Sequence, residues 1–297
     1  MSIGYFMTLD KNDEELLAWL RPTDVSINHM LARKKHEPTT GKWFLKSGEF
    51  MTWSNASKAS LWLYGKPGSG KTILCSSIIE HIIGLCNSTP SDQYAYFYFD
   101  FNQKWNGVDM LRSIIAQLCT CKKTVPREFH QLYQECKSYR SQVSQTHLLK
   151  AFPSLLANSY RTFIILDALD ECPAGIDRTD LLNAIKDMID SSSELYLNIL
   201  VTSRRERDIA MKFTNLIDNA IGLEESVVDS DIALYVRRCI RSDQEFQEWD
   251  DDTKKNMEQI LCKKANGMYD VLAYIANDDQ VQVGRMSIEN TTRLLVH

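Results

Sequence analysis

The sequence predicts an α/β protein with three layers, in which helices cover both faces of a five-stranded, mainly parallel sheet. Short apolar segments alternate with longer segments of helical periodicity from residue 61 onward. Residues 94–99 are apolar or aromatic at both parities, as expected for a strand that is buried on both faces. Strands that are connected through helices lie parallel, because each connection crosses back over the sheet with a right-handed turn.

Each predicted element rests on its own pattern of apolar side chains. The strands are short apolar segments, the last of them weaker than the others: 61–64, 94–99, 163–166, 197–201 and 220–223. The helices between them carry apolar side chains three and four residues apart: 71–85, 110–118 and 181–189.

A small helical subdomain is expected after the last strand. One helix begins near Asp229 or Ser230, either of which can cap it. Another runs from about residue 252 to 265, with Gly267 as the left-handed residue that follows it. The chain is therefore expected to divide into a helical or irregular lead-in, the sheet domain, the helical subdomain and a tail without assigned structure: 1–57, 58–225, 226–270 and 271–297.

Composition excludes several classes of protein. The 297 residues include 34 Lys and Arg against 39 Asp and Glu, and the net charge of −5 argues against non-specific binding of nucleic acid. No apolar run approaches the roughly 18 residues of a membrane-spanning helix. The apolar segment 3–7 has no basic leader before it, so no export signal is expected. The eight cysteines are then reduced thiols, and the expected location is cytoplasmic.

A phosphate-binding loop follows the first strand. Residues 65–72 match the pattern G-x-x-x-x-G-K-[ST] in full, between a predicted strand and a predicted helix. The glycines let backbone N–H groups surround a phosphate, and the start of the helix adds its positive dipole end. The expected nucleotide-binding residues are Gly65, Lys66, Pro67, Gly68, Ser69, Gly70, Lys71 and Thr72. Lys71 is expected to reach the β- and γ-phosphates, and Thr72 to ligate Mg²⁺.

Three acidic residues follow the third strand. Asp167 ends it directly and is expected to hold Mg²⁺, as the aspartate of a Walker B motif does. Asp170 and Glu171 come next, and one of them is expected to orient the attacking water as a general base. The alternative for either acid is that it caps the next helix.

An arginine follows the fourth strand. Arg204 is expected to contact the γ-phosphate and to report its loss, which makes it a catalytic candidate with Lys71, Asp170 and Glu171. The alternative is a solvated basic turn, since Arg205 and other basic residues lie beside it.

The motifs distinguish between classes of phosphate-loop protein. A Ras-like GTPase has glycine three residues after the strand-terminal aspartate, whereas this chain has Asp170, and it lacks an [NT]-K-x-D motif. A small-molecule kinase carries an arginine-rich lid, but the basic cluster at 204–207 is too close to the strand end to form one.

Together the motifs resemble the NACHT family of signal-transducing STAND P-loop NTPases. The resemblance is closest to the fungal NOD-like receptors with a nephrocystin-type N-terminal NTPase domain. It covers roughly residues 19–270, and the acidic segment and the lead-in are its specific parts. It rests on the lead-in, the phosphate loop, the acidic segment, the arginine and two helical segments: 19–20 with Asp24 and Asn28, 40–45, 49–50, 61–72, 166–172, 202–204, 231–236 and 265–268.

The resemblance implies a switch that is closed with ADP and able to oligomerise with ATP, in innate-immunity-like or heterokaryon-incompatibility signalling. It implies nucleoside triphosphate and Mg²⁺ as ligands, and further copies or full-length NOD-like receptors as partners. We expect slow nucleotide hydrolysis, and we expect a truncated receptor without its sensor repeats. Two alternatives stay open: a non-hydrolysing nucleotide-binding module that docks onto full-length receptors, and a phosphate-loop transferase. The residues do not decide between ATP and GTP.

Overall fold

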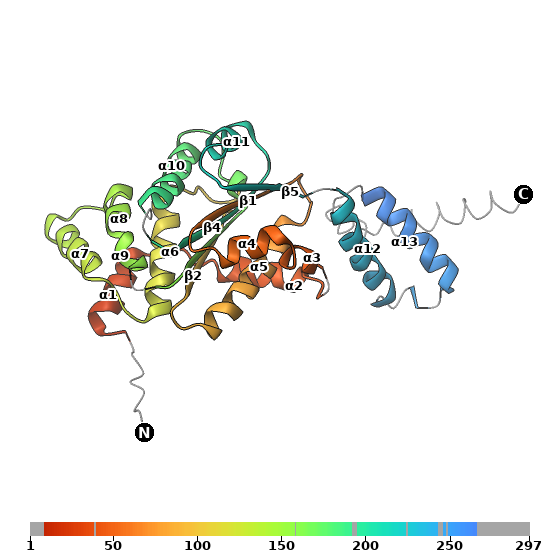
Figure 1. The fold of residues 1–297 in the computed structure, drawn as a ribbon, viewed down its shortest axis with the longest axis horizontal. Helices are drawn as coiled ribbons and strands as arrows, with labels where there is room; N and C mark the ends of the chain where they lie inside the picture. Colours follow the sequence, from red (N-terminus) through yellow and green to blue (C-terminus); the bar gives the residue numbers. More distant parts are fainter. Residues whose placement is uncertain are drawn as a thin grey trace, which may run out of the picture. The chain divides into compact units, whose positions relative to one another are not determined.

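The computed structural model describes residues 9–38, 40–157, 159–191, 195–223, 225–242, 246–247 and 249–265. The described residues of 1–36, 41–65 and 71–222 form one compact unit, and those of 37–40, 66–70 and 223–297 form another. The first unit contains the sheet and the helices that cover it (Figure 1). The predicted tail, 271–297, lies outside the described residues, as does Gly267.

A five-stranded sheet forms the centre of the first unit. Its strands are β1 (Ala59–Tyr64), β2 (Gln93–Tyr98), β3 (Thr162–Asp167), β4 (Leu197–Ser203) and β5 (Asn219–Gly222). The order across the sheet is β2-β3-β4-β1-β5, and every pairing is parallel. β3 and β4 are buried along their whole length, as their apolar centres at 163–166 and 199–201 predict. All five predicted strands are therefore present, and the predicted fold class is confirmed.

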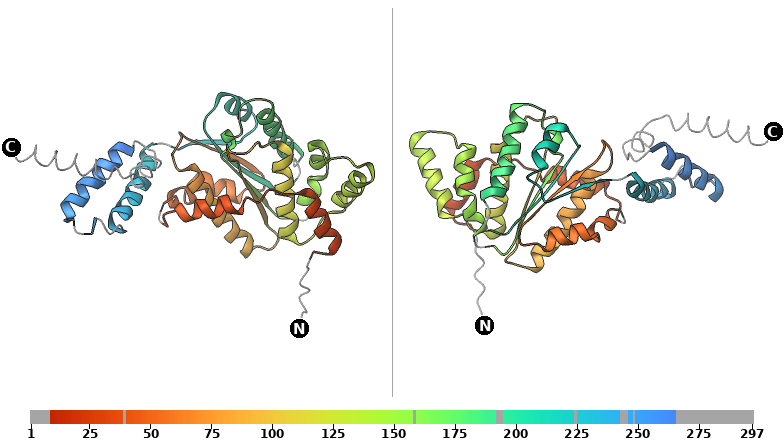
Figure 2. Two further views of the ribbon diagram at one scale, coloured as in Figure 1. Left: turned by 180° about the vertical axis from the view of Figure 1, so that it is seen from behind. Right: turned by 45° about the horizontal axis from the view of Figure 1, so that its top comes forward.

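The direction of each crossover decides which face its helix covers. From β1 the chain passes through α5 (Lys71–Ser88) to β2, which lies at one edge of the sheet. From β2 it crosses the sheet in the opposite direction, through β3 and β4, to β5 at the other edge. Right-handed connections then put α5 on one face and the returning helices on the other: α6 (Gly107–Lys122), α10 (Ile176–Ser191) and α11 (Arg207–Phe213). The two views in Figure 2 agree with these three layers.

Helices from the N-terminal region join the α5 face. They are α2 (Ser26–Lys35), α3 (Lys42–Leu45) and α4 (Gly48–Asn55). Phe50 of α4 packs against His81 of α5, and the ring nitrogen of Trp53 donates to the Ile199 carbonyl of β4 at 3.1 Å. The predicted lead-in thus supplies helices that pack directly on the sheet.

Four further helices lie in the described part of this unit: α1 (Lys11–Leu20), α7 (Arg127–Tyr139), α8 (Gln145–Ala151) and α9 (Pro153–Leu156). α1 belongs to the lead-in that was predicted to be helical or irregular, whereas α7, α8 and α9, like α11, were not predicted. Trp19 of α1 contacts Tyr133 of α7, and Nε2 of His130 on α7 lies 2.8 Å from Oδ1 of Asp13. Side-chain caps begin several helices; for α6, the Asn106 side chain accepts from the N–H groups of its first turn.

The second unit contains a helical pair, α12 (Glu225–Ser242) and α13 (Asp251–Ala265). A small apolar cluster is built from Ile232, Val236, Ile240 and Phe246. Arg237 and Glu258 join the helices through an ion pair of 2.6 Å. Both helices predicted for the region after the sheet are present, but α12 begins at Glu225, so positions 229 and 230 lie inside it and the predicted cap is wrong. In the part of the chain that the structure describes, none of the helices has the length and apolarity that crossing a membrane requires.

Candidate functional site

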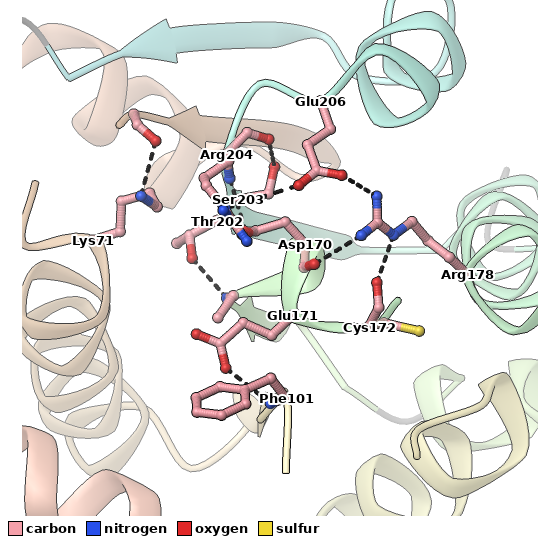
Figure 3. Close-up of polar contacts among 12 residues, drawn as sticks. Lys71, Phe101, Asp170, Glu171, Cys172, Arg178, Thr202, Ser203, Arg204 and Glu206 are labelled. Atoms are coloured by element: carbon pink, nitrogen blue, oxygen red, sulfur yellow. Dashed lines mark hydrogen bonds and ion pairs between the residues drawn. The ribbon is translucent and has the colours of Figure 1, made fainter. Parts of the chain in front are cut away.

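The predicted site residues gather where three parallel strands end. β4 lies between β1 and β3, so the segment that follows it lies between the phosphate-loop strand and the strand that ends in Asp167. Tyr64 is in register with Ser203, and the Gly65 N–H donates to the Ser203 carbonyl at 3.3 Å. The carboxyl edge of the sheet therefore brings together residues that are more than a hundred positions apart in the sequence (Figure 3).

The phosphate loop has the backbone conformation that its glycines allow. Gly68 and Gly70 have φ values of 70° and 80°, in a region of backbone conformation that residues with a Cβ rarely adopt. Helix α5 begins at Lys71, so its first N–H groups and its positive dipole end lie at the end of the loop. The Lys71 ammonium donates to the Gly65 carbonyl at 2.9 Å (Figure 3). The start of α5 and the Lys71 ammonium offer N–H donors and a cation, which fit a phosphate group.

Asp167 is held at the end of β3 by a neighbouring strand. It is 1% exposed, and the Thr202 hydroxyl donates to its Oδ1 at 2.6 Å. The same hydroxyl oxygen accepts from the Ala168 N–H at 3.0 Å. Thr202 therefore fixes both the carboxylate and the main chain that leaves the strand.

The two predicted Mg²⁺ ligands lie together. Burial raises the pKa of Asp167, while hydrogen bonds from Thr202, Thr72 and Cys75 and the charge of Lys71 act to lower it. Thr72 is thus within hydrogen-bonding reach of Asp167. A hydroxyl beside a buried carboxylate is the oxygen donor set that Mg²⁺ takes in phosphate-loop proteins, so these residues fit the ion.

Asp170 and Arg204 form a close pair. Ala168 adopts a left-handed conformation with φ of 57°, which ends β3 abruptly and leads into the short 3₁₀ turn η1 (Leu169–Glu171). Asp170 is buried there, and its two carboxylate oxygens accept from Arg204, from the backbone N–H at 2.8 Å and from Nε at 2.5 Å. This hydrogen bond raises the pKa of Arg204. Arg204 is therefore ion-paired, while 45% of its side chain stays exposed.

Glu171 has a different environment from its neighbour. Its Oε2 accepts from the Phe101 N–H at 3.2 Å, in the loop that follows β2 (Figure 3). Burial, together with the negative charges of Asp167, Asp170 and Asp100, raises the pKa of Glu171 to about 7, against the lowering effect of the Phe101 hydrogen bond. Neither Asp170 nor Glu171 caps helix α10, which begins at Ile176.

Sequence reasoning did not assign functional roles to several residues that complete the site. Thr202 had a usable signal, because it lies in the polar segment that ends a buried strand. Arg178 and Glu206 had none, since charged residues in a helix and in a loop are usually solvated. Arg178 is instead 3% exposed and hydrogen-bonded to the acidic segment.

Comparisons with known proteins identify the family. A sequence model of the family described as nephrocystin 3, N-terminal, matches residues 39–204, more than half of the chain. The chain belongs to this family. The vegetative incompatibility protein HET-E-1 of Podospora anserina is 28% identical over 211 residues, which make up 66% of this chain and 15% of that protein. These matches confirm the predicted resemblance, and the chain spans a small part of the length of that relative.

The family and the phosphate-loop fold together make the chain a nucleotide-binding, NTPase-like domain. Among solved structures, Drosophila ORC bound to DNA matches with a TM-score of 0.40 and 14% identity, over 95% of this chain and 72% of that one. The Aeropyrum pernix ORC1 protein in complex with DNA matches with a TM-score of 0.41 and 13% identity, over 73% of this chain and 59% of that one. Similarity at this level carries no inference about ligands or partners.

Proposed function

We propose that the chain binds ATP together with Mg²⁺ and hydrolyses it slowly, as a signalling switch. The observation that carries the proposal is the meeting of Lys71, Thr72 and Asp167 at the carboxyl edge of the sheet. When bound, Mg²⁺ would be held by Thr72 and Asp167 and would neutralise charge on the β- and γ-phosphates.

In the proposed reaction, water attacks the γ-phosphorus, the bond to the β–γ bridging oxygen breaks, and ADP and phosphate leave. The N–H groups of the phosphate loop and the Lys71 ammonium stabilise the charge on the phosphates. Glu171 accepts the proton of the attacking water. Arg204 stabilises the charge on the departing phosphoryl group.

The contacts support Glu171, rather than Asp170, as the base. Both carboxylate oxygens of Asp170 accept from Arg204, so Asp170 is assigned to position that arginine. Glu171 has one oxygen on the Phe101 N–H, and its pKa of about 7 is close to neutral pH. A base with such a pKa combines ionisation at neutral pH with useful basicity.

We further propose that this activity serves incompatibility or innate-immunity-like signalling in the cytoplasm, with further copies of the chain or full-length receptors as partners. The relation to HET-E-1 supports this proposal. No direct binding of nucleic acid is proposed, given the net charge of −5.

The test is titration of ATP into the wild-type protein and the Lys71→Ala variant, with Mg²⁺ present. Losing a charged hydrogen-bond donor is expected to weaken binding by about tenfold or more. Lys122→Ala is the matched control, because Lys122 also donates to main-chain carbonyls, those of Pro90 and Ser91. Equal affinity of the Lys71→Ala variant and the wild type would refute the phosphate-loop assignment. Tight binding without turnover would favour the non-hydrolysing module.

A further inference from the structure

A buried arginine clamps the main chain on both sides of Glu171. Arg178, on α10, donates from Nε to the Cys172 carbonyl at 2.6 Å and from Nη2 to the Asp170 carbonyl at 2.8 Å. These two carbonyls belong to the residues directly before and after Glu171. With 3% of its surface exposed, Arg178 makes these bonds away from competing water.

The third nitrogen of the same guanidinium reaches the segment after β4. Nη1 of Arg178 donates to the Glu206 carboxylate and lies 3.2 Å from Oδ2 of Asp208 (Figure 3 shows the Glu206 bond). Glu206 is the N-terminal boundary residue of α11. One side chain therefore ties the acidic segment after β3 to the segment that carries Arg204.

Arg204 contacts two residues that Arg178 also contacts, Asp170 and Glu206. Its Nε lies between two carboxylates, at 2.5 Å from Asp170 and at 3.9 Å from Oε1 of Glu206. Glu206 thus lies between the two arginines, and Asp170 contributes its carboxylate to Arg204 and its carbonyl to Arg178 (Figure 3). A displacement of either segment breaks bonds to the other.

We propose that Arg178 is a positioning residue that holds Glu171 and Arg204 in one fixed arrangement for hydrolysis. The inference rests on the proposed hydrolytic function. Arginine suits the task because its planar fork donates in three directions at once, whereas a lysine ammonium has neither the fork nor the fixed directions. Since Arg178 contacts the main chain of the acidic segment, its loss is expected to affect turnover more than binding of nucleotide.

Steady-state kinetics of Arg178→Lys and Arg178→Met provide the first test. Misplacing a catalytic group by about 1 Å costs up to about 10²-fold, so kcat is expected to fall by about ten- to a hundredfold with little change in KM. Glu206→Gln, at a partly exposed site, is expected to lower kcat to a smaller extent.

The matched controls are Arg161→Lys and Arg161→Met. Arg161 is also an ion-paired arginine with a main-chain acceptor: it donates to Asp92 at 2.7 Å and to the Ser54 carbonyl at 2.9 Å. It immediately precedes β3, at the amino end of the strand. These controls are expected to lose thermal stability while keeping kcat. The proposal is overturned if the Arg178 and Arg161 variants lose kcat to the same extent for the same loss of thermal stability.

Amide hydrogen exchange separates this inference from the proposed function. Arg178→Lys is expected to raise exchange in residues 168–172 and 204–206, whereas Arg161→Lys leaves them unchanged. If the wild type does not hydrolyse ATP, the hydrolytic function fails, and the exchange data still decide whether Arg178 holds the two segments. Unchanged exchange in both segments overturns the positioning role.

Discussion

Two adjacent carboxyl groups, those of Asp170 and Glu171, meet different partners because the main chain turns sharply between β3 and the next helix. Asp170 turns toward the segment after β4 and pairs with Arg204. Glu171 turns toward the loop after β2 and accepts from the Phe101 N–H. Sequence alone predicts that one of the two is the base, but it cannot separate them, because their partners come from loops that are distant in the chain.

The first prediction separates the two acids. Glu171→Gln keeps the shape of the side chain and removes its basicity, so ATP affinity is expected to stay while turnover falls by about 10²–10⁴-fold. Asp170→Asn is expected to reduce turnover less, by loosening Arg204. Binding titrations and phosphate-release assays measure both effects. Equal and small losses of turnover in the two variants would contradict the assignment.

The pH dependence of turnover tests the same residue. The pKa of Glu171 is raised to about 7, and the base acts in its ionised form. Turnover at saturating ATP is therefore expected to increase with pH up to about pH 7 and to level off above it. In Glu171→Gln, the residual turnover should lose this inflection. An inflection that persists in the variant would assign the titration to another group.

Among the elements, the strands were predictable and several helices were not. β3 and β4 are buried along their whole length and contain the apolar runs 163–166 and 199–201, so their sequence carries a strong signal. Helices α8 and α9 have only seven and four residues, too few to show a clear helical period. α7 buries Phe129, Leu132 and Cys136 at helical spacing, so its sequence did carry a signal for a helix. The role of Arg178 could not be predicted for another reason. Two of its partners are main-chain carbonyls, which every residue has, so the sequence does not indicate them.

The turn after β3 places a residue other than glycine in the left-handed region. Ala168 has a φ of 57°, which costs an L residue roughly 1–2 kcal/mol, while glycine pays about 0.5–1 kcal/mol in chain entropy. Ala168→Gly is therefore expected to increase the free energy of unfolding by up to about 1 kcal/mol. Ala168→Val should decrease it, because a β-branched side chain adopts this conformation poorly. Chemical denaturation of the three proteins measures the order, and a stabilising valine would contradict it.

At the scale of the whole molecule, nucleotide binding should be visible as stability. A ligand at a hundred times its Kd stabilises the folded state by about 2.7 kcal/mol. ATP with Mg²⁺ is therefore expected to raise the midpoint of thermal unfolding of wild-type protein by several degrees. Lys71→Ala should lose most of this increase, and Lys122→Ala should keep it. A shift of equal size in both variants would indicate binding outside the phosphate loop.

Two tryptophans give the molecule its own optical probes. The indole N–H of Trp62 donates to the Ser203 hydroxyl at 2.8 Å, next to Arg204. The carbonyl of Trp105 accepts from the Cys172 thiol, one residue beyond Glu171, at 3.6 Å. Both indoles are buried, so their fluorescence depends on the local packing of these two segments. Emission spectra of variants that retain one of them can follow each segment separately during the nucleotide cycle, without an added label.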